Sequence, residues 1–195
     1  MNTIDYYNKN AKKYFDFSIS ADMSKQYDMF LKYVRSNGKI LDFGCGGGRD
    51  SKYFSDLGFK VDAIDGSEEL CKLAREYTGL DIKCMDFSDL DKYDYYDGIW
   101  ACSTLLHVKK DKMLSILKKL RDALKKDGYI YASFVDGQNI EQYREDGRYF
   151  NDLTDERFRY LSELSSLEVA DFNLNHSTTQ TGRDIYWDNY ILKRR

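Results

Sequence analysis

Glycine is concentrated in one short stretch of the chain, where it could shape a ligand site. Residues 44, 46, 47 and 48 are glycine, and they follow an apolar run at residues 40–43. Glycine has no Cβ, so its backbone can turn sharply and approach a ligand closely. A loop that opens a helix also points backbone N–H groups and the positive end of the helix dipole at whatever binds there. The stretch therefore predicts the ligand cradle of an α/β domain.

The spacing of these glycines distinguishes this loop from two known nucleotide-binding loops. The dinucleotide fingerprint G-x-G-x-x-G would need a third glycine where this chain has Arg49. The pattern is instead G-x-G-x-G, from Gly44, Gly46 and Gly48. The phosphate-binding pattern G-x-x-x-x-G-K-[ST] does not occur in the sequence. A dinucleotide oxidoreductase is therefore disfavoured.

An aspartate follows each of the next two strands that the sequence predicts after the glycine stretch. Asp65 follows the strand expected at residues 59–64, where it can accept hydrogen bonds from both ribose hydroxyls of an adenosine. Its alternative role is in a turn, because Asp-Gly-Ser is favourable turn chemistry. Asp86 follows the strand expected at 81–85 and could accept from an exocyclic amine, with Phe87 beside it for stacking. The alternative for this pair is a turn aspartate next to a core phenylalanine.

Strands and helices alternate through residues 38–135. Further strands are expected at 95–102 and 129–135, and helices at 49–57, at 68–77 and after Asp111. This alternation predicts βαβ units, a parallel sheet and right-handed crossovers. Two helices precede it: an aromatic stripe over residues 3–16, expected to pack mainly on the core, and a helix capped by Asp22 that ends at residues 37–38.

In the last third of the chain, strands and helices no longer alternate regularly. Residues 136–153 form a long polar connection, which predicts a lid or a substrate loop. A helix capped by Thr154 follows. Two strand-like segments, 168–173 and 184–192, are then expected to pair as an antiparallel hairpin, with a turn around residues 181–182.

Composition bounds the class of protein. The 195 residues, 42% hydrophobic and 32% charged, favour one soluble globular domain. The N-terminus lacks the features of a secretory signal, and no apolar run is long enough to span a membrane, so a cytoplasmic protein is expected. The four cysteines form no CxxC pair, which favours reduced core thiols over a disulfide framework or a metal site. The net charge of −3 argues against bulk nucleic-acid binding.

Four stretches together resemble the ordered motifs of class I S-adenosylmethionine-dependent methyltransferases. They are Ile-Leu-Asp-Phe-Gly-Cys-Gly-Gly-Gly-Arg (40–49), Ala-Ile-Asp-Gly-Ser (63–67), Met-Asp-Phe (85–87) and Tyr-Tyr-Asp-Gly-Ile-Trp-Ala-Cys-Ser-Thr-Leu-Leu-His-Val (95–108). The Gly-Arg-Asp-Ser at 48–51 is similar to small methyltransferases of the tellurite-resistance type. One departure is Lys-Asp-Gly at 126–128, where the family often has Pro-Gly-Gly, in a turn remote from the cofactor.

The resemblance implies an α/β fold with a doubly wound, mostly parallel seven-stranded sheet, helices on both faces and an antiparallel C-terminal hairpin. We expect a single methyltransferase domain over residues 1–195. Its parts would be a helical cap (1–37), a cofactor-binding core (38–135), and a substrate loop, helix and hairpin (136–195). Either a monomer or a homodimer is compatible with the sequence.

The resemblance also implies S-adenosylmethionine as the cofactor. Asp42 and the backbone of residues 44–48 would meet its methionine half, and Asp65 would hold its ribose. Residues 85–87 would surround the adenine, and residues 101–102 would line the methyl-transfer site. Arg49 would pair with Asp42, Asp50 or the methionine carboxylate, or lie on the surface. The expected cofactor-binding set is Tyr14, Asp42, Gly44, Cys45, Gly46, Gly48, Arg49, Asp65, Gly66, Ser67, Met85, Asp86, Phe87, Ala101 and Cys102.

Few residues are candidates for contact with the methyl acceptor. His107 could act as a base near neutral pH, or only shape the pocket. Arg148 and Tyr149 could bind an anionic or aromatic acceptor, although Arg148 could equally be a solvated surface residue. Tyr14 could meet the sulfonium through a cation–π contact. His176 is expected to be inert in a polar turn.

The absence of proline bears on the acceptor class. Adenine-amino methyltransferases resemble one another in an Asn/Asp-Pro-Pro-aromatic motif after the fourth strand, and cytosine-carbon methyltransferases use Pro-Cys. This chain has no proline, so neither motif can occur. We therefore expect in-line methyl transfer to a small molecule, with oxygen, nitrogen, sulfur and metalloid acceptors all open. The alternative is a non-catalytic S-adenosylmethionine-binding module that acts as a partner subunit or sensor.

Overall fold

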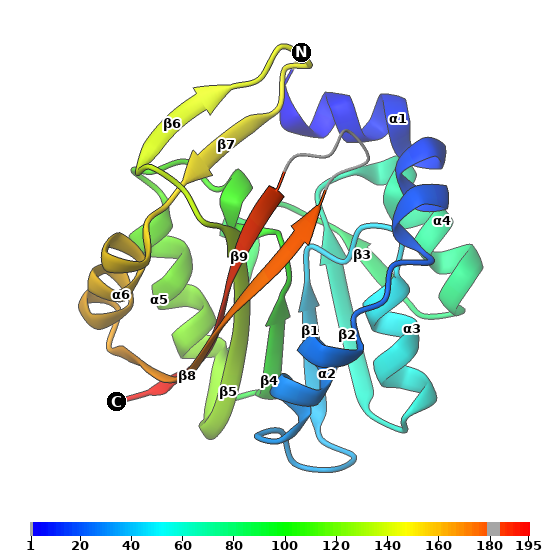
Figure 1. The fold of residues 1–195 in the computed structure, drawn as a ribbon. Coiled ribbons are helices and arrows are strands. Elements are labelled where there is room, and N and C mark those ends of the chain that lie inside the picture. The colour runs from blue at the N-terminus through cyan, green and yellow to red at the C-terminus, as the bar shows by residue number, and fades with distance from the viewer. Residues whose placement is uncertain (1, 179–183) are drawn as a thin grey trace.

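One seven-stranded sheet runs through the computed structural model, which describes residues 2–178 and 184–195. Its strand order is β3-β2-β1-β4-β5-β9-β8 (Figure 1). The first five strands are parallel, and β9 and β8 add on antiparallel, which confirms the predicted fold class. The strands are β1 (Lys39–Phe43), β2 (Lys60–Asp65), β3 (Ile82–Cys84), β4 (Tyr96–Ala101), β5 (Leu124–Val135), β8 (Leu167–Thr178) and β9 (Asp184–Arg194). The turn predicted at residues 181–182 lies outside the described residues.

The strand order reverses between β1 and β4. From β1 the chain builds outward through β2 and β3 on one side, and it then returns to add β4 and β5 on the other side. In an open sheet of this kind, a crevice forms outside the carboxyl ends of the strands where the order reverses. The glycine loop begins at the end of β1 and therefore lies at this position.

Helices cover both faces of the sheet, as the alternation predicts. On one face lie α2 (Ser24–Leu31), α3 (Arg49–Asp56) and α4 (Glu68–Thr78), and on the other lie α5 (Met113–Ala123) and α6 (Asp155–Leu164). Successive residues of β1 serve opposite faces: Ile40 packs with Phe30 and Phe54, whereas Leu41 packs with the cluster that contains Leu117. Two buried clusters thus sandwich the parallel strands.

Helix α1 (Thr3–Ser18) lies across the carboxyl end of the sheet, beside α4 (Figure 1). The predicted packing of its aromatic stripe on the core is wrong, because Ala11 is the one buried residue of this helix. The Asn8 side chain accepts hydrogen bonds from the Ser67 hydroxyl (2.8 Å) and from the Glu69 N–H (3.2 Å), which ties α1 to the first turn of α4. The helix therefore covers the end of the sheet where a ligand is expected.

Residues 136–153, for which the sequence predicts a lid or a substrate loop, are more regular than a long polar connection suggests. They contain a two-stranded antiparallel hairpin, β6 (Ile140–Tyr143) and β7 (Tyr149–Asp152), which lies at the same end of the molecule as α1 (Figure 1). Gly147 has a φ of +85° in its turn, a conformation that suits glycine. Facing tyrosines at positions 143 and 149 then pair across the two strands.

Some predicted boundaries and environments are also wrong. Helix α2 ends at Leu31 rather than at residues 37–38, and α5 begins at Met113 without a side-chain cap, so Asp111 does not cap it. Cys84 is exposed on the short strand β3 rather than buried in the core, whereas Cys45 and Cys71 are buried. Within the described ranges, no helix is long and apolar enough to cross a bilayer.

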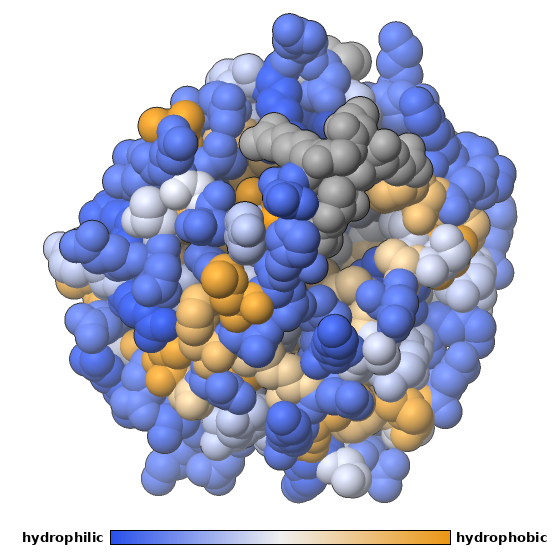
Figure 2. Space-filling view, viewed as in Figure 1, coloured by the Kyte–Doolittle hydropathy of each residue, from blue (hydrophilic) through white to orange (hydrophobic). Residues whose placement is uncertain are grey.

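The face seen in Figure 2 is mostly hydrophilic, with a small group of apolar side chains over β8 and β9. The exposed apolar residues of β8 include Phe172 and Leu174.

Candidate active site

The glycine loop adopts a backbone that side chains would obstruct. Gly44 has a φ of +83° and Gly46 a φ of +54°. A Cβ at Gly44 would lie 2.4 Å from the Thr104 side chain, and one at Gly46 would lie 3.2 Å from the Tyr14 ring. The N–H groups of Gly44 and Cys45 donate to the Ile64 carbonyl at 2.9 and 3.0 Å, so the end of β2 holds the loop. The loop is thus a pre-formed backbone cradle, and Gly48 leads from it directly into α3.

Asp65 connects this cradle to the next loop. Its Oδ2 accepts from the Gly46 N–H at 2.9 Å, and its Oδ1 accepts from the Ser67 N–H at 2.8 Å. Ser67 in turn caps α4 by accepting from the Leu70 N–H. Burial raises the pKa of Asp65, and its backbone hydrogen bonds oppose that effect. Asp65 therefore fulfils the turn role, and it also lines a cavity with its remaining acceptor capacity.

This cavity, called here the cofactor cavity, lies between α1 and the strand ends and measures about 70 Å³. Asp65, Gly66 and Phe87 line one end, while Gly44 and Gly46 line the cradle side. Pockets for small molecules usually measure about 300–1,000 Å³. This cavity is therefore smaller than a nucleoside needs, and α1 is expected to move outward when one binds.

Residues 85–87 are placed unequally around this cavity. Phe87 lines it and stacks on Phe43, with ring centroids 4.3 Å apart. Met85 packs against the core, and its N–H donates to the Asp65 carbonyl at 3.0 Å. Asp86 is exposed, and its Oδ1 accepts from the N–H (2.8 Å) and the hydroxyl (2.6 Å) of Ser88, at the start of the short helix η1 (Phe87–Asp89). Asp86 is therefore engaged in a local turn.

Asp42 lies beneath the cradle and does not line the cofactor cavity. It is 1% exposed, and its Oδ2 accepts from the Ser51 hydroxyl of α3 at 2.6 Å. Burial and the neighbouring Asp50 carboxylate raise the pKa of Asp42 to about 8. The protonated form therefore predominates at neutral pH, and this residue supports the cradle by joining β1 to α3.

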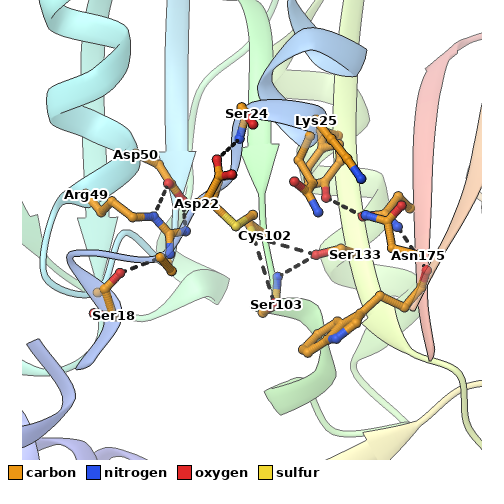
Figure 3. A pocket seen from close by; sticks show the side chains of 18 of the residues that line it. Ser18, Asp22, Ser24, Lys25, Arg49, Asp50, Cys102, Ser103, Ser133 and Asn175 are labelled. Atoms are coloured by element: carbon orange, nitrogen blue, oxygen red, sulfur yellow. Dashed lines mark hydrogen bonds and ion pairs between the residues drawn. The ribbon is translucent and has the colours of Figure 1, made fainter. Parts of the chain in front are cut away.

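Arg49 pairs with Asp50, one of the partners considered for it. Its Nε and Nη2 donate to Asp50 Oδ1 and Oδ2 at 2.6 and 2.9 Å, and Nη1 donates to the Ser18 carbonyl at 3.2 Å (Figure 3). Asp50 also accepts from Trp100 Nε1 at 2.8 Å and from the Tyr27 hydroxyl. Sequence reasoning missed this anchoring role of Asp50, because two of its partners, Tyr27 and Trp100, come from distant segments.

A second, larger cavity of about 840 Å³ lies beside the cradle and is called here the acceptor cavity. The α1–α2 connection, the ends of β4 and β5, and the hairpin of β8 and β9 line it. At its floor the Ser103 N–H donates to Ser133 Oγ at 2.9 Å, and the Ser133 hydroxyl donates to Cys102 Sγ at 3.7 Å (Figure 3). Sequence reasoning missed both serines, although Ser133 is a polar residue inside an apolar strand. Ala101, just before them, is fully buried in the core.

His107, at the end of the short helix η2 (Leu105–His107), lines the cofactor cavity and not the acceptor cavity. Its Nδ1 lies 2.8 Å from the Tyr149 carbonyl, and its Nε2 lies 3.0 Å from the Tyr7 hydroxyl. Burial lowers the pKa of His107 to about 4, so the ring is neutral near pH 7. A carbonyl only accepts, so Nδ1 carries the proton and Nε2 accepts from Tyr7. This arrangement favours a positioning role over that of a free base.

Arg148 and Tyr149 join the hairpin to α1 and line neither cavity. Arg148 donates to Asp146 at 2.7 Å, and its guanidinium lies 4.5 Å from the centre of the Tyr6 ring. The Tyr149 N–H donates to the Thr3 hydroxyl at 2.9 Å. These contacts hold α1 in place over the cofactor cavity.

His176 and Tyr14 are among the residues that line the acceptor cavity. His176 lies in strand β8 rather than in the predicted turn, and its Nε2 pairs with Asp184 at 2.9 Å. Tyr14 lines both cavities, with its ring against Gly46. Burial raises the pKa of Tyr14.

Comparison with known proteins gives consistent matches. Residues 40–128 match the family described as "Methyltransferase domain". An uncharacterized methyltransferase of Staphylococcus carnosus is 24% identical over 94% of this chain and 96% of its own length. The probable S-adenosyl-L-methionine-dependent methyltransferase TehB of Haemophilus influenzae is 26% identical over 64% of this chain, a match that covers 43% of that protein.

A solved structure shows the same fold. The Burkholderia thailandensis 1,6-didemethyltoxoflavin-N1-methyltransferase, with bound 1,6-didemethyltoxoflavin and S-adenosylhomocysteine, superposes with a TM-score of 0.77. It is 19% identical, and the match covers 98% of this chain and 85% of that one. The family match and the methyltransferase relatives, together with the glycine cradle and the carboxylate that ends β2, support a class I S-adenosylmethionine-dependent methyltransferase. The solved structure shows the shared fold.

Proposed function

We propose that the chain transfers a methyl group from S-adenosylmethionine in the cofactor cavity to a small molecule in the acceptor cavity. One observation carries this proposal: the two cavities share lining residues. Tyr14, Gly44, Gly46, Cys102 and Ser103 line both, so the cavities adjoin at this point, which is called here the opening. A reactive group held on one side of the opening can meet a nucleophile held on the other.

The chain's residues fit the cofactor. Asp65 would accept from its ribose hydroxyls, Phe87 would contact its adenine, and the cradle N–H groups at the start of α3 would meet its methionine carboxylate beside Arg49. When bound, the cofactor supplies a methyl group on a positively charged sulfur, which is activated toward in-line displacement. The chain then has to align the nucleophile and exclude water, and orientation of this kind is worth about 7–11 kcal/mol in well-organised cases.

The acceptor cavity supports a small acceptor. Its volume of about 840 Å³ suits a single small molecule. Part of its wall comes from residues outside the cofactor-binding core, in the segments 14–26, 174–176 and 187–189. This supports assigning residues 1–37 and 136–195 to closure and to acceptor binding. The Burkholderia enzyme of the same fold holds a small molecule beside its cofactor product, and this supports the same class of acceptor here.

Label transfer tests this proposal directly. The protein is incubated with S-adenosylmethionine labelled in its methyl group and with three fractions of a bacterial extract: small molecules, nucleic acids and proteins. We expect label in the small-molecule fraction, and none when Asp65→Ala is used. Label mainly in nucleic acid or protein would overturn the assignment of the acceptor. Binding of S-adenosylhomocysteine without transfer to any fraction would favour the non-catalytic module.

A further inference from the structure

We propose that the hydroxyls of Ser103 and Tyr14 orient the acceptor at the opening, and that the acceptor is an uncharged nitrogen heterocycle attacking through a ring nitrogen lone pair. Ser133 would act as a positioning residue for Ser103. The inference rests on the proposed function and names the acceptor class of the same site.

The backbone of Ser103 is held in an uncommon conformation. Its φ is +53°, in the left-handed region that residues with a side chain rarely adopt. The Ser103 N–H donates to Ser133 Oγ at 2.9 Å, and Ser133 is 2% exposed within β5 (Figure 3). Strain of this kind persists where the surroundings fix it, and it is frequent at functional sites. Here it turns the chain off β4 so that Ser103 lines both cavities.

Two hydroxyls at the opening retain hydrogen-bonding capacity. Within the part of the chain that the structure describes, the Tyr14 hydroxyl makes no hydrogen bond. The Ser103 hydroxyl has one weak contact, with Cys102 Sγ at 3.8 Å. Both hydroxyls line the two cavities without a strong partner in the protein, so each is available to a ligand bound at the opening. Both can donate to an acceptor atom of a bound ring.

Among the residues that the structure describes, the opening offers no group that takes up a proton at neutral pH. Burial raises the pKa of Tyr14 and raises the pKa of the Cys102 thiol to about 12, so both stay protonated. Arg49 remains cationic and is balanced by Asp50, whose carboxylate already accepts several hydrogen bonds. His107 is engaged on its two ring nitrogens.

The other ionisable groups named here line the acceptor cavity but not the cofactor cavity, so they are not among the residues of the opening. Asp22 and Lys25 belong to the α1–α2 connection and the first turn of α2, and His176 lies on β8, paired with Asp184. Asp22 accepts from the Ser24 N–H at 2.9 Å, which lowers its pKa. An alcohol or phenol, which needs its proton removed as it attacks, therefore finds no base at the opening.

An uncharged ring nitrogen needs no base. Its lone pair forms the bond to the methyl carbon while the electron pair of the breaking carbon–sulfur bond passes to sulfur. The heterocycle gains one positive charge, the sulfur loses one, and no proton moves in this step. A ring N–H elsewhere on the product can lose its proton to water afterwards. The aromatic side chains of Tyr131 and Trp187 line the acceptor cavity and suit a planar ring.

Product analysis comes first in the test. The labelled small molecule from the extract is isolated, and the position of its methyl group is read by mass spectrometry and NMR. We expect a methyl group on a ring nitrogen, and a kcat that stays constant from about pH 6 to 9 because no base titrates at the opening. A methyl group on a hydroxyl oxygen would overturn this inference and leave the proposed function standing. Absence of transfer to any small molecule would overturn both.

Variants then test the two hydroxyls. Tyr14→Phe and Ser103→Gly should each lower kcat/KM for the acceptor about tenfold, the cost of one lost hydrogen bond. Calorimetry with S-adenosylhomocysteine should show little change. Glycine is chosen at position 103 because it keeps the positive φ. If Ser103→Gly retains full activity, the hydroxyl has no role and the inference is overturned. Ser115→Ala, on an exposed serine of α5, is the matched control.

Ser133 has its own pair of variants. Ser133→Ala removes the acceptor for the Ser103 N–H, whereas Ser133→Thr keeps the hydroxyl. We expect loss of acceptor kcat/KM in the first and recovery in the second, with cofactor affinity retained in both. Equal losses in both variants would overturn the positioning role.

Discussion

Replacing Asp65 by alanine should remove most of the affinity for the cofactor. Its carboxylate accepts from the Gly46 N–H at 2.9 Å and from the Ser67 N–H at 2.8 Å, so it holds two segments of the site together. It also lines the cofactor cavity, where it would accept from the ribose hydroxyls. The substitution removes both functions and leaves two backbone donors without their acceptor.

The magnitude follows from the number of hydrogen bonds lost. A hydrogen bond to a charged group contributes about 1.5–3 kcal/mol, so two ribose contacts amount to about 3–6 kcal/mol. Since about 1.4 kcal/mol corresponds to a tenfold change in Kd, the affinity should fall by about 100-fold or more. The lower end applies because Asp65 is only partly buried by its neighbours and water competes for its oxygens.

Calorimetry with S-adenosylhomocysteine measures this change, and far-ultraviolet circular dichroism checks that the variant is folded. Asp86→Ala is the matched control, because the family resemblance gives this aspartate an adenine contact while the structure gives it a local turn with Ser88. We expect a change of less than about threefold for Asp86→Ala, the size of a weak surface effect. A loss of affinity as large as that of Asp65→Ala would refute the reasoning.

Three further substitutions test the supports around the site. Burial raises the pKa of Asp42 from 3.8 to about 8. The contribution of Asp42 to the free energy of unfolding therefore falls as the pH rises through that range. In urea unfolding, Asp42→Asn should gain stability relative to wild type as the pH rises from about 5 to 8. Asp50→Ala should cost about 3–5 kcal/mol in the same measurement, because it leaves Arg49 and Trp100 unpaired. Arg148→Ala should speed release of S-adenosylhomocysteine about fivefold in stopped-flow fluorescence, because the cation–π contact of Arg148 with Tyr6, worth about 1 kcal/mol, holds α1. Replacing the exposed Lys12 of α1 by alanine should not change this rate. Equal effects of Arg148→Ala and Lys12→Ala would count against this role.

The parallel core was predictable because its signals are local. Apolar runs, punctuating glycines and aspartates at strand ends fall in the same short windows as the strands and helices that they specify. Asp65 follows from the same logic, because the end of β2 must lie beside the end of β1. Asp86 has the same sequence signal but turns outward, since Ser88 two residues later satisfies its carboxylate.

The remaining features depend on contacts between distant segments. Asp50 accepts hydrogen bonds from Tyr27 and Trp100, and the sequence around position 50 gives no signal that predicts either partner. The aromatic stripe of α1 indicates a buried face, but only the tertiary structure shows that this face covers a cavity. The hairpin of β6 and β7 was missed because its residues are polar and exposed on β6.

Helix α1 has a consequence for the order of events in a turnover. The helix roofs the cofactor cavity, and the connection that leads from it to α2 forms one wall of the acceptor cavity. One segment therefore completes both compartments. While α1 is displaced to admit the cofactor, the acceptor cavity lacks a wall. We expect compulsory-order kinetics in which the cofactor binds first, and the methylated product leaves before the spent cofactor.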